Sequence, residues 1–185
     1  SSNETWEATD TLVAKVEHNG PVLPSAEIHS TAHAILPGVT PGQYHVIVRT
    51  DIFDQIYEAN EEDNFSTSSA RLAADVPELV PGEPVTGELS TGQVIYYRLN
   101  ANAGDDVLIS LDSESSDSAN ELYARYGAMP DRGNYDFHFD APYEPDQTIL
   151  IPSAQSGTYY VMVRGDHVPQ APKGYTLLAE VLGFG

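Results

Sequence analysis

Alternating polar and apolar residues recur along the chain in short segments separated by Gly and Pro. Side chains on a β-strand point to opposite faces with a period of two, so this alternation predicts strands rather than helices. The predicted strands cover residues 11–18, 27–36, 43–50, 63–72, 94–100, 106–112, 121–126, 147–151, 158–164 and 175–182. Their spacing and the turns between them predict an all-β fold of antiparallel β-sandwiches.

A proline-rich stretch separates two groups of strands. Residues 73–84 contain Pro77, Pro81 and Pro84, and proline lacks the N–H group that a strand donates to its neighbour. We therefore predict an extended linker over residues 73–84. It joins a first sandwich over residues 1–72 to a second over residues 85–185, in tandem.

The first domain carries two consecutive motifs. Residues 42–51 form a strand pattern with Tyr-x-Val-x-Val, and residues 57–64 follow with Tyr-Glu-x-Asn-Glu-x-Asp-Asn. These motifs resemble the second half of a CARDB domain, a cell-adhesion-related, immunoglobulin-like domain of large bacterial surface proteins. The resemblance implies an incomplete immunoglobulin-like sandwich, from which the first two strands are missing.

The second domain carries four motifs, in residues 87–99, 104–107, 121–127 and 157–161. They are Gly-Glu-Leu followed by Tyr-Tyr-Arg-Leu, Gly-Asp-Asp-Val, Glu-Leu-Tyr-Ala-Arg-Tyr-Gly and Gly-Thr-Tyr-Tyr-Val. Together they resemble the bacterial pre-peptidase C-terminal (PPC) domain, a jelly-roll-type sandwich appended to secreted proteases and multidomain surface proteins. Neither resemblance implies catalysis, so we predict that the chain is not an enzyme.

Charge and composition restrict the partners. The 28 Asp and Glu residues outnumber the 8 Lys and Arg residues, and the formal net charge of −20 repels phosphate backbones. No apolar run approaches the roughly 18 residues of a membrane-spanning helix. We therefore predict no nucleic-acid partner and no membrane insertion. The absence of Cys and the acidity suit an exported bacterial protein, extracellular or on the cell surface, and the first residue, Ser1, predicts a cut or processed piece.

Two acidic segments are candidate calcium sites, because Ca²⁺ takes six to eight oxygen ligands. The first contains Glu58, Asn60, Glu61, Asp63 and Asn64. The second contains Asp112, Asp117 and Asn120, with Asp136 on a later segment. Asp117 stands at the sixth position from Asp112, where an EF-hand requires Gly, so the second segment is not an EF-hand. The alternative interpretation of both segments is solvated acidic loops.

Three aromatic residues alternate with polar ones near the second calcium candidate. On a strand, Tyr135, Phe137 and Phe139 share one face. An exposed face of this kind is a candidate carbohydrate platform, and a buried one belongs to the core.

Two other motifs are not predicted to form functional sites. His29 and His33 lie on a predicted strand, where four residues span about 13 Å, too far for one zinc ion. The tripeptide Arg-Gly-Asp at residues 164–166 is interpreted as the end of a strand and the start of a turn, rather than as a displayed receptor ligand.

These observations predict a non-catalytic structural or adhesion module of an exported bacterial surface or filament protein. We expect it to be stabilised by Ca²⁺ and to associate with other copies or domains of the same surface protein. Missing strands in the first domain would leave Leu12, Val46, Val48 and Phe65 exposed and allow a neighbouring subunit to supply a strand. The alternative is a carbohydrate-binding accessory module of a secreted hydrolase, with glycans as partners.

Overall fold

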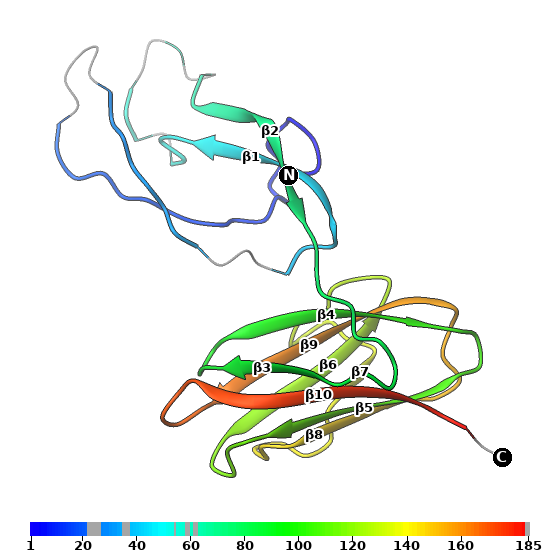
Figure 1. Cartoon of the computed structure of the whole chain (residues 1–185). Helices are drawn as coiled ribbons and strands as arrows, with labels where there is room; N and C mark the ends of the chain where they lie inside the picture. Colours follow the sequence, from blue (N-terminus) through cyan, green and yellow to red (C-terminus); the bar gives the residue numbers. More distant parts are fainter. Residues whose placement is uncertain (22–26, 35–37, 54, 58–59, 61–62, 184–185) are drawn as a thin grey trace. The chain divides into compact units, whose positions relative to one another are not determined.

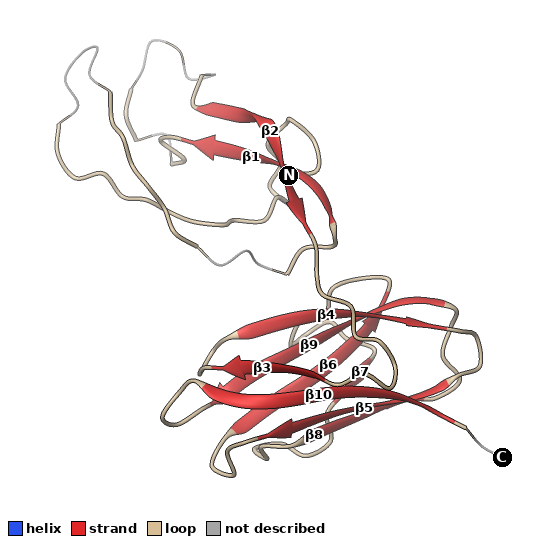
Figure 2. Cartoon of the chain, viewed as in Figure 1, coloured by secondary structure: helices blue, strands red, loops and turns tan. Residues whose placement is uncertain are grey.

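The computed structural model describes all residues except 22–26, 35–37, 54, 58–59, 61–62 and 184–185. The described residues form strands, turns and loops, and none forms a helix that could cross a membrane. Figure 2 shows this all-β content, which confirms the predicted fold class. The strands are β1 (Gly42–Arg49), β2 (Phe65–Ala74), β3 (Val85–Leu89), β4 (Val94–Ala101), β5 (Asp106–Ser113), β6 (Ala119–Tyr126), β7 (Phe137–His138), β8 (Gln147–Ile151), β9 (Gly157–His167) and β10 (Lys173–Leu182).

The chain divides into two compact units, Ser1–Asp75 and Val76–Gly185. The first unit contains the antiparallel pair β1 and β2, with an irregular register between His45 and Ile47. Residues 11–18 and 27–34 are described as loops, so the prediction of strands there is wrong; residues 35–36, the end of the second predicted strand, lie outside the described residues. Alternation alone does not make a strand, because a strand also needs a neighbour for its backbone hydrogen bonds. The described residues of this unit form one two-stranded sheet rather than a complete sandwich.

The second unit is a sandwich of two four-stranded sheets. One sheet has the strand order β3-β10-β5-β8, and the other has the order β4-β9-β6-β7. Figure 1 shows the two layers facing each other, and all pairs within them are antiparallel. The strands β7 and β8 lie at the edges of their sheets. This arrangement confirms the predicted second sandwich.

Period-two alternation explains the core of this sandwich. On β5, Val107, Ile109 and Leu111 are buried and face inward, whereas the residues between them are partly exposed. Inward residues of β4, β6, β8, β9 and β10 join them in one apolar cluster. The predicted strands of this unit are all present, and β8 has the predicted bounds. The short strands β3 and β7 were absent from the strands predicted by alternation.

A pair of tyrosines connects the two sheets inside the core. The hydroxyl oxygens of Tyr97 on β4 and Tyr175 on β10 lie 2.6 Å apart, so each polar tip has a partner although both rings are buried. Burial, followed by the hydrogen bond with Tyr97, raises the pKa of Tyr175. A Cβ at Gly87 would lie 2.6 Å from the Tyr175 hydroxyl, so β3 needs a glycine at this position.

The segment predicted to be an extended linker, residues 73–84, packs against the second unit over residues 76–84. Leu79 is fully buried, and its N–H donates to the Arg98 carbonyl at 2.8 Å. Gly82 N–H donates to the Ala179 carbonyl at 2.8 Å. Proline lacks only its own N–H, so the residues between prolines remain free to bind a sheet.

Candidate functional site

The first calcium candidate lies partly outside the described residues. Glu58 and Glu61 are among the residues that the structure leaves undescribed. Asn60 and Asp63 are exposed, and Asn64 binds β1 through Thr50, whose hydroxyl donates to Asn64 Oδ1 at 2.9 Å. Asn64 therefore holds the start of β2 against the end of β1.

The second calcium candidate is dispersed over different environments. Asp112 and Asp117 are exposed, whereas Asn120 is 2% exposed. Asp136 is exposed, and its carboxylate accepts a hydrogen bond from Tyr126 N–H at 2.8 Å. Among the residues that the structure describes, no group of three or more His, Cys, Asp or Glu side chains is placed to hold a metal ion.

Asn120 instead fixes the loop between β7 and β8. Its Nδ2 donates to the Pro145 carbonyl at 2.7 Å, and Gln147 Nε2 donates to the Ala141 and Glu144 carbonyls at 2.7 and 2.9 Å. These carbonyl partners determine the orientation of both amides. The buried oxygens Asn120 Oδ1 and Gln147 Oε1 have no hydrogen-bond partner, and water is the ordinary donor for such atoms.

A charged cluster, which we define as Glu121, Arg132, Arg164 and Asp166, lies on the outer face of the β4-β9-β6-β7 sheet. Glu121 on β6 is opposite Arg164 on β9, and its side chain is only 7% exposed. Its two oxygens lie 2.7 Å from Arg132 Nη2 and 3.1 Å from Arg164 Nη1. Arg164 also donates to Asp166. The charges of this cluster therefore neutralise one another.

The charged cluster shifts the pKa values of its members. The hydrogen bond from Arg164 holds the pKa of the Asp166 carboxyl below its usual range. Burial, with the nearby Glu121 charge as the second cause, raises the pKa of Tyr123, whose hydroxyl donates to Glu121 Oε2. The Arg-Gly-Asp tripeptide lies within β9 and is not in a displayed turn, so the expected strand end at Arg164 is wrong. The sequence analysis did not predict that Glu121 pairs with Arg164, because the two residues are neighbours only through the pairing of β6 with β9.

The three alternating aromatic residues do not form one uniform face. The Tyr135 and Phe139 rings lie 5.2 and 5.4 Å from the Tyr123 ring. Phe137 lies 6.4 Å from Tyr159, and Phe137 and Phe139 pack against the core cluster. Tyr135 is 39% exposed and is the member of the three that presents a substantial surface to solvent.

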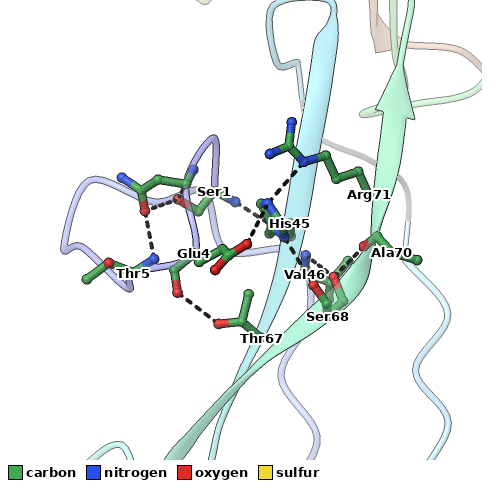
Figure 3. A network of polar contacts seen from close by, with 10 residues as sticks. Ser1, Glu4, Thr5, His45, Val46, Thr67, Ser68, Ala70 and Arg71 are labelled. Atoms are coloured by element: carbon green, nitrogen blue, oxygen red, sulfur yellow. Dashed lines mark hydrogen bonds and ion pairs between the residues drawn. The ribbon is translucent and has the colours of Figure 1, made fainter.

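A buried histidine, His45 on β1, organises the polar contacts of the first unit (Figure 3). Its Nε2 accepts a hydrogen bond from Arg71 Nε at 3.1 Å, so its Nδ1 carries the hydrogen that is donated to the Ser68 carbonyl at 3.0 Å. Glu4 lies 3.8 Å from Nε2. Both ring nitrogens are satisfied within the protein, so this histidine has a structural role.

A shallow cleft of about 330 Å³ lies beside β7 and β8. Asp136, His138 and Asp140 are charged or polar lining residues that are exposed, and we call them the rim. Leu108 on β5 and Leu150 on β8 are opposite each other in the strand register and are apolar lining residues, which we call the floor. The remaining lining residues are Phe137, Thr148 and Ile149. The cleft thus combines two carboxylates with apolar surface.

Two solved structures are similar to part of this chain. The pre-peptidase C-terminal domain of a collagenase from Bacillus anthracis has a TM-score of 0.46 and 18% identity, with 57% of this chain and 95% of that chain covered. PliG from Aeromonas hydrophila, a periplasmic inhibitor of g-type lysozyme, has a TM-score of 0.41 and 15% identity, with 58% and 97% covered.

One known protein matches this chain in sequence. This chain is 35% identical over 88 residues to alkaline serine exoprotease A of Vibrio alginolyticus, a match of 47% of this chain and 16% of that protein. The chain therefore corresponds to a small part of that relative. Residues 93–165 match the bacterial pre-peptidase C-terminal domain family. The family and the exoprotease relative confirm the predicted extracellular or secreted location. Residues 93–165 of this chain are a bacterial pre-peptidase C-terminal domain.

Proposed function

We propose that this chain is a non-catalytic structural or adhesion module of an exported bacterial surface protein. The observation that carries this proposal is the PPC domain at residues 93–165, whose charged cluster is neutralised internally. The shared motifs at residues 42–51 and 57–64 support a partial CARDB domain in front of it. In this arrangement the chain attaches its parent protein to other copies or domains of the surface layer.

Strand exchange is the proposed mode of assembly. On the β1–β2 pair, Val46, Val48 and Phe65 are 50%, 59% and 50% exposed, as the sequence predicts. Leu12 is 78% exposed. Apolar strands without a covering layer recruit other chains, and an added strand would cover them while completing the backbone hydrogen bonds.

Sedimentation tests both the attachment and the assembly. The purified chain is expected to pellet with an insoluble protein or cell-wall matrix without releasing soluble product.

In the absence of any matrix, the purified chain is expected to sediment as a species heavier than its 20.1 kDa monomer. Val48→Lys places a charge on the exposed strand and is expected to restore the monomer, whereas Thr86→Lys on β3 is the control. Product release would contradict a non-catalytic role, and a stable wild-type monomer would contradict strand exchange.

Calcium stabilisation is a further part of the proposal, supported by the acidic segments at residues 58–64 and 112–120. Bound Ca²⁺ would offset repulsion between carboxylates. Millimolar Ca²⁺ is therefore expected to raise the melting temperature by about 4 to 8 °C for each kcal/mol that its binding adds to the free energy of unfolding. Mg²⁺ at equal ionic strength is expected to have a smaller effect. Asp63→Ala and Asp136→Ala separate the two candidate sites, since Asp136 belongs to the second site on a later segment. Equal melting temperatures in Ca²⁺ and chelator would show that the acidic segments are solvated loops.

The second candidate function is carbohydrate binding by an accessory module of a secreted hydrolase. The favouring observation is the partly exposed Tyr135 ring, which lies 4.9 Å from His138 and 5.2 Å from Tyr123. Rings of this kind stack on sugar faces. A glycan array with the wild-type chain and Tyr135→Ala distinguishes this candidate, because only a carbohydrate platform would lose a signal on removal of the ring.

A further inference from the structure

We propose that the cleft beside β7 and β8 binds a basic side chain, Lys or Arg, of an extended polypeptide. The proposal rests on the proposed function and names a partner class for the adhesion module. The residues that carry it are Asp136 and Asp140 on the rim and Leu108 and Leu150 on the floor.

The rim is held in place by the rest of the sandwich. Asp136 N–H donates to the Ala124 carbonyl at 3.0 Å, and Phe139 N–H donates to the Leu122 carbonyl at 2.9 Å. Immediately after Asp140, the Ala141 carbonyl accepts the Gln147 amide at 2.7 Å. The segment that carries both carboxylates is therefore fixed on both sides, and a preorganised site loses little conformational entropy on binding.

The charge of the rim selects a cation. Within the described part of the chain, neither Asp136 nor Asp140 has an ion-pair partner within 4.0 Å. This differs from the charged cluster, where each acid faces an arginine. The net charge of −20 adds a long-range attraction for basic partners.

The floor suits the aliphatic part of the same side chain. Leu150 is 50% exposed, and Leu108 lies opposite it on β5. Lys and Arg place their methylene groups on apolar surface while the charged group stays near water. A basic side chain thus covers the floor with its methylene groups and brings its charge to the rim.

The position of the cleft favours a polypeptide over a free small cation. Both β7 and β8 are edge strands of their sheets, in the described topology. An edge strand presents unpaired backbone N–H and C=O groups, which an extended peptide can bind while its side chain enters an adjacent pocket. A polyamine would use the carboxylates but not the backbone groups.

The test uses the full chain in chelator and the short peptide acetyl-Ala-Ala-Lys-Ala-Ala-amide. Titration calorimetry measures affinity, and the NMR signal of the His138 ring, which lines the cleft, reports the place of binding. Asp140→Asn removes one charge from the rim and is expected to weaken binding about tenfold. Leu150→Ser is expected to weaken it as well. Asp117→Asn, an exposed site outside the cleft with the same charge change, is the control.

The outcomes separate the alternatives. Equal loss in Asp140→Asn and Asp117→Asn would mean non-specific attraction to an acidic protein and would overturn the proposal. Equal affinity for a peptide with norleucine in place of Lys, or tighter binding of glucosamine oligomers or spermidine, would also overturn it. If Asp140→Asn still pellets with the insoluble matrix, the cleft proposal fails while the attachment function stands. If the wild type binds the peptide but never pellets, the attachment function fails while the cleft proposal stands.

Discussion

Replacing Leu79 by Ala is expected to lower the free energy of unfolding of the second unit by about 3 kcal/mol. Leu79 is fully buried in the apolar core cluster, although it lies in a proline-rich stretch. Truncation removes apolar contacts and leaves a cavity that the surrounding β-strands fill only partly. Denaturant unfolding followed by circular dichroism measures the change.

The neighbouring Val80 provides the matched control, since it is 40% exposed. Val80→Ala removes methyl groups from the same stretch and is expected to change the unfolding free energy much less. If the two variants are equally stable, residues 76–84 are a free linker and the observed packing of Leu79 does not contribute to folding. A deletion that starts at residue 85 would then fold as well as the whole second unit.

Replacing Glu121 by Ala is expected to cost about 3 kcal/mol of stability, because it removes the buried carboxylate that two arginines share and leaves only Asp166 to balance both of their charges. Arg164 is the group most affected: its side chain is 17% exposed, against 58% for Arg132. Arg132 can turn to water, whereas Arg164 keeps Asp166 as its remaining partner. Thermal and denaturant unfolding both report the loss.

Two variants determine whether charge is the cause. Glu121→Gln retains the shape and one acceptor but removes the charge, so it is expected to lose most of the same stability. Glu180→Ala, on an exposed position of β10, is expected to change stability little. If Glu121→Ala behaves like Glu180→Ala, the charged cluster contributes no more than a surface ion pair, and water or Asp166 compensates Arg164.

The charged cluster and the cleft show two different uses of acidic residues. In the charged cluster, each carboxylate has an arginine within 4 Å. These ion pairs connect β6, β9 and the loop after β6, so their charges are neutralised within the protein. On the cleft rim, Asp136 and Asp140 lie beside apolar floor. Surface carboxylates next to apolar area are the ones available to a basic partner.

The sequence predicted six of the eight strands that the structure describes in the second unit, missed β3 and β7, and ended β9 three residues too early. Residues 147–151 alternate between buried and exposed positions, and β8 has those bounds. Alternation works on β5 and β8 because each has one face in the core and the other toward solvent, so a shift by one residue would bury polar groups. The same pattern at residues 11–18 predicted a strand that the structure does not form, since no strand in the described residues pairs with it.

The sequence by itself also determined the family of residues 93–165, the secreted location and the exposure of Val46 and Val48. The tertiary structure alone decided which acidic residues form an ion pair with an arginine. Glu121 and Arg164 are 43 residues apart, and the antiparallel pairing of β6 with β9 makes them neighbours. Likewise, the amide groups of Asn120 and Gln147 both donate to carbonyls of the turn at residues 141–145. Local patterns specify which face a side chain takes, whereas its partner depends on strand order and register, which are set by long-range packing.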